Sequence, residues 1–196
     1  MKKTILVDCD GVVLNWEYAF DIFMEEHGFK RVEGADYIYN IGERYGIDIH
    51  QGKKLIKMFN ESAAIGFLPP LRDAVEYVTK MADEGWEFIA ITSLSTNKYA
   101  QRLRKRNLDK LFGKDTFVKV TCLGTGADKD KALAKYKDSG LYWVEDKVEN
   151  AFAGKLQGLE PILMEHGFTT FIQIWKISMT RAVKGKHQDI KIIMYL

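Results

Sequence analysis

The stretch Ile5-Leu6-Val7-Asp8-Cys9-Asp10-Gly11 decides the fold of this chain. A short, continuous apolar run is typical of a buried strand in a parallel sheet, and the acidic residues and glycine that follow it mark the loop at the end of the strand. Similar apolar runs follow at residues 88–91, 117–120 and 141–144, with a weaker one at 159–164. Together they predict five strands, and their uninterrupted apolar character favours a sheet covered on both faces.

Segments with a helical spacing of apolar residues separate these predicted strands. One covers 71–82, between Pro69-Pro70 and Gly85, which are typical start and stop signals. Others lie near 99–103, 132–136 and 148–152. Strands that alternate with helices predict a Rossmann-like α/β fold, in which a parallel sheet carries helices on both faces. Right-handed crossovers then place the carboxyl ends of all strands along one edge, where ligands bind.

The segment 16–67 does not follow this alternation and has a helical pattern throughout. Apolar residues from Trp16 to Met24 share one helical stripe that stops at Gly28, and a second helix begins at Asp48 and continues through Met58. We therefore predict a small helical cap, residues 16–67, inserted after the first strand of a core made of residues 1–15 and 68–167. Residues 168–196 form a C-terminal tail, for which a terminal strand or an amphipathic helix is the simplest interpretation.

The composition excludes several classes of protein. The 196 residues are 46% hydrophobic and 29% charged, which is expected of a soluble globular chain and too apolar for disorder. A net charge of +2 gives no case for nucleic acid or an anionic membrane as the main partner. No apolar run reaches the ~18–20 residues that a membrane span needs. The two cysteines, Cys9 and Cys122, cannot form a disulfide scaffold and fit a reducing cytoplasm.

Asp8 and Asp10 follow the first predicted strand directly, at the edge of the sheet where ligands bind. A second pair with the same spacing, Asp128 and Asp130, follows a glycine-containing loop and opens a predicted helix. Acidic residues in that place cap the helix and suit its dipole. Position therefore distinguishes the two pairs, and only Asp8 and Asp10 are candidates for chemistry.

Polar residues also end two other predicted strands. Thr92, with Ser93 as the alternative in the same turn, can hold a phosphate oxygen, although a simple cap or turn residue is an equal alternative. Glu145 and Asp146 end the fourth strand, so that four carboxylates would meet at one edge. Such like charges cannot all stay ionised unless a cation compensates them. Hard oxygen ligands with room for water and phosphate suit Mg²⁺.

Two lysines lie just before Glu145 and Asp146 in the predicted order of elements. Either Lys129 or Lys131 could neutralise both a nucleophilic carboxylate and an incoming phosphate, although an ordinary surface lysine is the simpler alternative for each. We prefer Lys129, because Leu133 follows it by four residues as an apolar anchor on the same helix face.

These features occur in the order of the motifs of the haloacid dehalogenase superfamily, whose members are mostly phosphatases, and residues 1 to about 165 resemble it. The resemblance implies that Asp8 is the nucleophile and Asp10 the acid and base. It also implies that Thr92 binds phosphate and that Lys129 stabilises charge. Mg²⁺ would be held by Asp8, by the backbone carbonyl of Asp10 and by Asp146. Glu145 departs from the Gly or Asp common there, so we expect it to support Asp146 rather than to bind the metal.

A finer similarity concerns the substrate. The stretch Phe67-Leu68-Pro69-Pro70-Leu71, which leads toward Thr92-Ser93, is similar to the 5'(3')-deoxyribonucleotidase group. The predicted cap is rich in aromatic residues, and Trp16 lies where the chain leaves the Asp8–Asp10 loop. A small helical unit needs large side chains for its own core. Alternatively, Trp16 stacks on a flat substrate group, which favours a nucleoside 5'-monophosphate over a sugar phosphate.

Two alternatives of other classes stay open. The basic run 101–106 favours a phosphatase acting on nucleic-acid ends if it contacts nucleic acid, but a solvated helix face is the simpler interpretation. The other is a non-catalytic phosphate-binding domain, against which the complete set of acidic residues and lysine argues. We therefore predict a cytoplasmic, Mg²⁺-dependent phosphomonoester hydrolase that works on a small phosphorylated metabolite through an aspartyl-phosphate.

Overall fold

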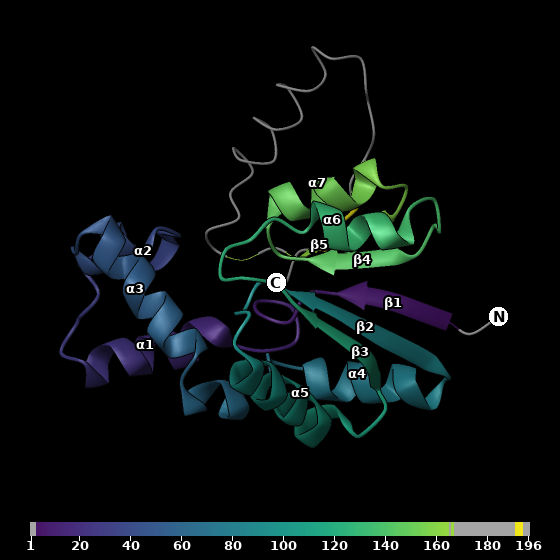
Figure 1. Ribbon diagram of the computed structural model, residues 1–196, viewed down its shortest axis with the longest axis horizontal. Helices are drawn as coiled ribbons and strands as arrows, with labels where there is room; N and C mark the ends of the chain where they lie inside the picture. Colours follow the sequence, from purple (N-terminus) through teal and green to yellow (C-terminus); the bar gives the residue numbers. More distant parts are fainter. Residues whose placement is uncertain (1–2, 165, 167–190, 194–196) are drawn as a thin grey trace, which may run out of the picture.

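The computed structural model describes residues 3–164, 166 and 191–193. Its strands form one parallel sheet in the order β3-β2-β1-β4-β5-β6 (Figure 1). The strands are β1 (Lys3–Val7), β2 (Trp86–Thr92), β3 (Phe117–Cys122), β4 (Tyr142–Glu145), β5 (Glu160–Met164) and β6 (Lys191–Ile193). The predicted α/β fold is therefore confirmed. The short strand β6 falls in the predicted tail, and the rest of that tail, 168–190 and 194–196, lies outside the described residues.

The order of the strands places a switch of winding direction at β1. The chain moves from β1 outward to β2 and β3, and then returns to the other side of β1 to form β4, β5 and β6. Val7 is in register with Ala90 on β2 and with Val144 on β4. In sheets of this kind, ligands bind outside the carboxyl ends of the strands at such a switch point. The residues that follow β1 and β4 are thus directed to this crevice.

Helices cover both faces of the sheet (Figure 1). The helices α4 (Ala74–Asp83) and α5 (Lys98–Phe112) lie on one face, and α6 (Asp130–Leu133) and α7 (Val148–Leu156) lie on the other. Side chains of β1 alternate between the two layers, since Ile5 and Val7 join one buried cluster and Leu6 joins the other. Burial on both faces explains why β1 is an uninterrupted apolar run.

One predicted helix is shorter than expected. The pattern 71–82 predicts a helix from Leu71, but α4 begins at Ala74. The preceding residues are instead bound to the turn after β1, because Leu71 N donates to Val13 O at 3.0 Å and Asn15 N donates to Pro69 O at 2.9 Å. Two consecutive prolines favour this extended path over a helical one. The segment therefore braces the loop that carries Asp10.

The segment 16–67 is helical, as its pattern predicts. It contains α1 (Trp16–Glu26), α2 (Ile41–Tyr45) and α3 (Ile49–Asn60), with 3₁₀ turns η1 (Ala35–Tyr37) and η2 (Ala63–Phe67); a further 3₁₀ turn, η3 (Ala134–Tyr136), follows α6. As expected, α3 starts at Asp48, whose Oδ1 accepts hydrogen bonds from His50 N and Gln51 N. The helix continues through Met58, as expected, and this side chain is exposed.

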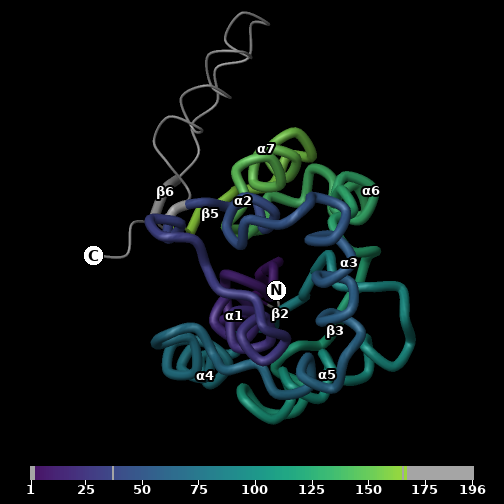
Figure 2. The backbone as a smooth tube through the Cα atoms, turned by 90° about the vertical axis from the view of Figure 1, so that its left-hand side faces the viewer, coloured from purple at the N-terminus to yellow at the C-terminus, as the bar shows by residue number. Residues whose placement is uncertain are grey.

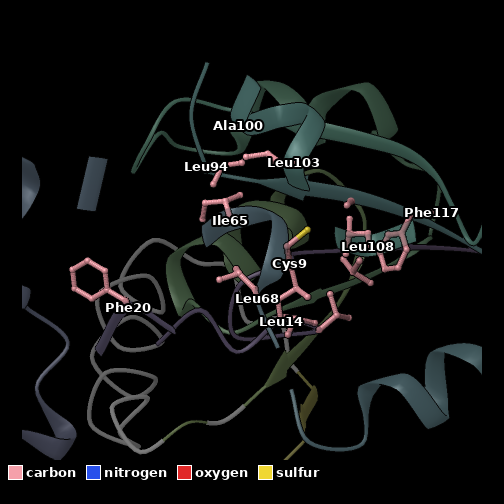
Figure 3. Close-up of a cluster of buried hydrophobic side chains, with 14 of the residues drawn as sticks. Cys9, Leu14, Phe20, Ile65, Leu68, Leu94, Ala100, Leu103, Leu108 and Phe117 are labelled. Carbon is pink, nitrogen blue, oxygen red and sulfur yellow. The ribbon is translucent and has the colours of Figure 1, made fainter. Parts of the chain in front are cut away.

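The helices α1, α2 and α3 lie off the edge toward which the strands point (Figures 1 and 2). They are not separated from the sheet, because one buried cluster extends from Phe20 of α1 through Ile65 and Leu68 to Leu103 and Phe117 (Figure 3). We propose that residues 16–67 act as a cap on a core of residues 1–15 and 68–167. Among the described residues, no helix is long and apolar enough to cross a membrane.

Candidate active site

Asp8 is the first residue beyond β1 and is 7% exposed. Its backbone N–H donates to Val144 O at 2.9 Å, which continues the pairing of β1 with β4, and its Oδ1 accepts from Cys9 N at 2.7 Å. Burial raises the pKa of Asp8 to about 7, assisted by the charges of Glu145 and Asp10 and opposed by Lys129. Burial also raises the pKa of the adjacent Cys9 thiol to about 12, so this thiol stays protonated and is a poor nucleophile.

Gly11 brings the loop after β1 against the end of β4. It adopts a positive φ of 76°, and a Cβ atom there would lie 2.2 Å from Oδ2 of Asp146. Only glycine meets both conditions without strain, because other residues are disfavoured at this φ and would collide with the carboxylate. The loop also reverses tightly, since Cys9 O accepts hydrogen bonds from the N–H groups of Val12, Val13 and Leu14.

Lys129 is the buried cation of the site. Its Nζ lies 2.6 Å from Oδ2 of Asp8 and 2.7 Å from Oε2 of Glu145. Its side chain is 1% exposed, whereas Lys131, the alternative, is exposed. Burial alone would lower the pKa of Lys129, but the charges of Asp8 and Glu145 raise it, so the ammonium stays charged. Lys129 is therefore the lysine that the fold places beside Asp8.

Glu145 is fully buried at the end of β4 and its oxygens are occupied by donors. Oε2 binds Lys129, and Oε1 accepts from the backbone N–H groups of Asp146 and Lys147 at 3.1 and 3.0 Å. Burial raises its pKa to about 7, against the lowering effect of Lys129. Glu145 thus contacts both Lys129 and the turn that follows β4, and the supporting role expected for it stays a prediction.

Asp8, Glu145 and Asp146 form an acidic cluster whose oxygens lie within 4.8 Å of one another. Burial and the neighbouring charge of Asp8 raise the pKa of Asp146 to about 6. When all three carboxylates are ionised, they carry three negative charges. The ammonium of Lys129, which contacts Asp8 and Glu145, balances one of these charges and leaves two. A divalent cation would balance this charge, and carboxylate oxygens are the ligands that Mg²⁺ prefers. The residues present therefore fit Mg²⁺.

Thr92 ends β2 next to this cluster and is completely buried. Its Oγ1 has no hydrogen-bond partner among the residues that the structure describes, and it borders the same cavity as Asp8. A buried hydroxyl without a partner is costly and needs an explanation. The neighbouring Ser93 differs, because its Oγ donates to Ala127 O at 2.7 Å. Thr92 is thus the better of the two candidates for a ligand oxygen.

The carboxylate of Asp10 is held by a residue that the sequence pattern did not single out. Nη1 and Nη2 of Arg104 donate to Oδ1 and Oδ2 of Asp10 at 2.6 and 3.1 Å. The interpretation of 101–106 as a solvated helix face is therefore wrong for Arg104, which is fully buried, although Arg102 and Arg106 are exposed. The signal was present in the spacing, because Arg104 shares the helix face of Ala100 and Leu108.

A cavity of about 800 Å³ lies between the helical segment and the ends of the strands. The carboxylates, Thr92 and Lys129 line one side, and side chains of the predicted cap line the other, among them Trp16, Tyr39, Ile41, Arg44, Lys53 and Ile56. Trp16 stacks on Phe20 with ring centroids 4.5 Å apart, and its Nε1 donates to Oδ1 of Asn60 at 2.9 Å. Trp16 is therefore part of the aromatic core of the helices and of the cavity wall at once.

No protein-family model matches the chain. A curated relative, described as an uncharacterized 32.4 kDa protein of Enterobacteria phage T4, is 31% identical over 144 residues. The alignment covers 70% of this chain and 51% of the relative, so the chain spans about half the length of that protein.

Several solved structures share the fold over nearly the whole chain. A haloacid dehalogenase-like family hydrolase from Streptococcus pneumoniae matches with a TM-score of 0.64 at 10% identity, covering 99% of this chain and 94% of that one. The D,D-heptose 1,7-bisphosphate phosphatase of B. bronchiseptica, complexed with magnesium and phosphate, matches with a TM-score of 0.54 at 13% identity, covering 97% and 92%. The chain has the haloacid dehalogenase-like fold.

Proposed function

We propose that the protein hydrolyses phosphomonoesters through a phosphorylated Asp8. The observation that carries the proposal is the contact of one buried ammonium, Lys129, with Asp8, at 2.6 Å and beside a buried Thr92 hydroxyl without a partner among the described residues. An anionic nucleophile repels an anionic phosphate unless fixed positive charge lies between them. Lys129 supplies such charge, and Thr92 supplies a donor for a phosphate oxygen.

The reaction would proceed in two displacements at phosphorus. A carboxylate oxygen of Asp8 attacks phosphorus, the bond from phosphorus to the ester oxygen breaks, and Asp10 gives its proton to the departing alcohol. Water then attacks the phosphorus of phospho-Asp8 while Asp10 takes its proton, and the bond between phosphorus and Asp8 breaks. Inorganic phosphate leaves, and Asp8 and Asp10 return to their starting forms.

Asp8, Asp146 and the backbone carbonyl of Asp10 would hold Mg²⁺ in this scheme. When bound, the cation would neutralise phosphate oxygens and orient the ester for in-line attack. The proposal is supported by the acidic cluster of Asp8, Glu145 and Asp146, and by the solved phosphatase of the same fold that carries magnesium and phosphate. Glu145 would keep Lys129 in place rather than bind the cation, since both of its oxygens already accept hydrogen bonds.

For the substrate, we propose a nucleoside 5'-monophosphate. The cavity of about 800 Å³ has room beyond the phosphate position, and its far wall combines the indole of Trp16 with the apolar side chains of Ile41 and Ile56. Such a wall suits a flat base better than a sugar rich in hydroxyl groups. Lys53 on the same wall favours an anionic ligand, whereas Arg44 is paired with Glu17 at 2.6 Å.

A phosphatase acting on nucleic-acid ends is the second candidate. It is favoured by a basic hollow of about 430 Å³ on α5, lined by Arg102, Lys105, Arg106, Asp109, Lys110 and Lys114. Clustered lysines and arginines bind nucleic acid through its phosphates, with an affinity that falls steeply as salt increases. If this is the function, 5'-phosphorylated oligonucleotides are hydrolysed faster than mononucleotides at low salt, and the two rates become similar at high salt.

The test is phosphate release by the purified protein from p-nitrophenyl phosphate and from a panel of nucleotides, sugar phosphates and 5'-phosphorylated oligonucleotides. We expect release that requires Mg²⁺ and is lost on chelation, with nucleoside monophosphates preferred. No release from any ester at any divalent cation concentration would leave phosphate binding without catalysis as the function of the site. Preference for sugar phosphates would overturn only the proposed substrate.

A further inference from the structure

Burial of the charged Arg104 side chain costs free energy, and its packing in the fold does not explain why a charged residue stands there. Its side chain is fully buried on α5, on the face that also carries Ala100, Leu103 and Leu108 (Figure 3 labels these three neighbours). A buried ion pair stabilises a fold little, because removing both charges from water offsets their attraction. An apolar side chain of similar volume would fill this position at least as well. The guanidinium of Arg104 therefore indicates a role other than packing.

The geometry of the pair restricts Asp10 in a specific way. One guanidinium nitrogen binds each carboxylate oxygen, at 2.6 and 3.1 Å. A planar guanidinium that binds both oxygens fixes the rotation of the carboxylate as well as its position, which a single ammonium contact does not. The charge of Asp10 raises the pKa of Arg104, so this donor stays protonated at any working pH.

The pair spans the boundary between the buried layer and the cavity. Arg104 is 0% exposed, whereas the carboxylate of Asp10 is 23% exposed and borders the cavity beside Asp8 and Thr92. The guanidinium thus approaches Asp10 from the protein side and leaves its other side toward the ligand space. Each carboxylate oxygen has two acceptor positions, so one on each oxygen stays available to exchange a proton.

We propose that Arg104 is a positioning residue for proton transfer by Asp10, a role that rests on the phosphatase function proposed above. Asp10 gives a proton to the leaving alcohol and later takes one from water, and both transfers need a carboxylate held within hydrogen-bond reach of the reacting oxygen. Arg104 holds it there from α5 without touching the substrate.

The dependence of the rate on the leaving group distinguishes this role from a structural one. An alkyl alcohol is a poor leaving group that needs Asp10's proton, whereas p-nitrophenolate departs with little help. In Arg104→Lys one ammonium replaces the paired donors, so we expect the single-turnover rate of alcohol release from an alkyl phosphate to fall about 100-fold. In a single turnover on p-nitrophenyl phosphate, the release of p-nitrophenolate should fall by less than about 10-fold, because it precedes the hydrolysis of phospho-Asp8, which needs Asp10 for either ester. Arg104→Gln, which keeps an amide donor, serves if the lysine variant does not fold.

A double-mutant cycle gives a second readout. If Arg104 acts through Asp10, then Arg104→Lys should have almost no further effect on the alkyl phosphate in an Asp10→Asn background. Lys98→Arg, an exposed basic residue at the start of the same helix, is the control and should behave as the wild type. Thermal unfolding of each variant checks that the fold is retained.

The outcomes separate the two proposals. Equal losses in the single-turnover release of both leaving groups, or full additivity with Asp10→Asn, would overturn the positioning role while leaving the phosphatase function intact. A wild type that releases phosphate from neither ester would overturn the phosphatase function and the positioning role with it. A selective loss on the alkyl phosphate that disappears in the Asp10→Asn background would establish the role.

Discussion

The ammonium of Lys129 contacts the carboxylate of Asp8 at 2.6 Å, and the side chains are 1% and 11% exposed, respectively. Lys129 is delivered by the start of α6 and Asp8 by the end of β1, so two distant segments meet to form the pair. Glu145 shares the same ammonium at 2.7 Å. One cation therefore compensates two buried carboxylates, and the properties of the site depend on it.

Removal of this cation should affect both stability and catalysis. Lys129→Met keeps most of the side-chain volume but leaves Asp8 and Glu145 buried without a partner charge, so the free energy of unfolding should fall by about 3–5 kcal/mol. Phosphate release should fall at least 100-fold. Urea unfolding and steady-state rates check both, with Lys131→Met, an exposed lysine two residues on, as the control. Similar losses of stability and of phosphate release in both variants would show that neither property depends specifically on the charge of Lys129.

The raised pKa of Glu145 predicts how stability changes with pH when divalent cations are removed. Its pKa rises from 4.5 to about 7 on folding, so the folded state binds more protons than the unfolded state between these values. The contribution of Glu145 to stability is therefore complete below pH ~4.5 and is lost as pH rises through about 7. Glu145→Gln cannot ionise, so its stability relative to the wild type should increase by about 3 kcal/mol between pH 4.5 and 8.

Urea unfolding in a chelating buffer measures this difference at several pH values. Glu145→Gln also loses the ionic contact with Lys129, which changes its free energy of unfolding by the same amount at every pH. Only the change with pH in the difference from the wild type therefore tests the prediction. A difference that stays flat across this range would mean that Glu145 is ionised in the folded protein at pH 5.

Metal affinity should depend on Asp146 more than on Glu145. Both residues belong to the acidic cluster, but both oxygens of Glu145 already accept hydrogen bonds. Asp146→Asn should weaken Mg²⁺ binding at least 10-fold in calorimetric titration, and Glu145→Gln should weaken it less. Asp130→Asn, an exposed acidic residue of α6, should bind Mg²⁺ as the wild type does. Equal losses in Asp146→Asn and Glu145→Gln would assign the cation to both carboxylates.

Trp16 should affect nucleotides more than small esters. The indole borders the cavity, and stacking a base on an aromatic ring is worth roughly 1–3 kcal/mol in nucleic-acid systems. Trp16→Leu should therefore raise KM for a nucleoside monophosphate about 10-fold and change KM for p-nitrophenyl phosphate little. Because Trp16 also stacks on Phe20, circular dichroism must show that the helices persist. Equal changes for both substrates would make Trp16 a core residue only.

The sequence predicted most of the fold because the strands of the sheet are buried on both faces and read as plain apolar runs. It also predicted that Asp8, Thr92 and Asp146 meet, since residues that end parallel strands share one edge. The spacing of Arg104 from Ala100 and Leu108 indicated a buried position, but an arginine within a basic run is normally solvated. Its partner, Asp10, lies 94 positions earlier, so the sequence did not indicate their contact. The start of α4 was missed for a similar reason, since a contact with the loop after β1 holds Leu71 outside the helix.

Trapping the phosphorylated residue tests directly whether Asp8 is the nucleophile. Asp10→Asn should form the phospho-enzyme but hydrolyse it slowly, because the base that activates water is lost. This variant is incubated with p-nitrophenyl phosphate, whose leaving group needs little help from Asp10, and with Mg²⁺. Acid quenching and peptide mapping in a mass spectrometer should then place one phosphoryl group on Asp8. The double variant Asp8→Asn/Asp10→Asn should carry none. A phosphoryl group on any other residue, or the same label in the double variant, would contradict the central claim.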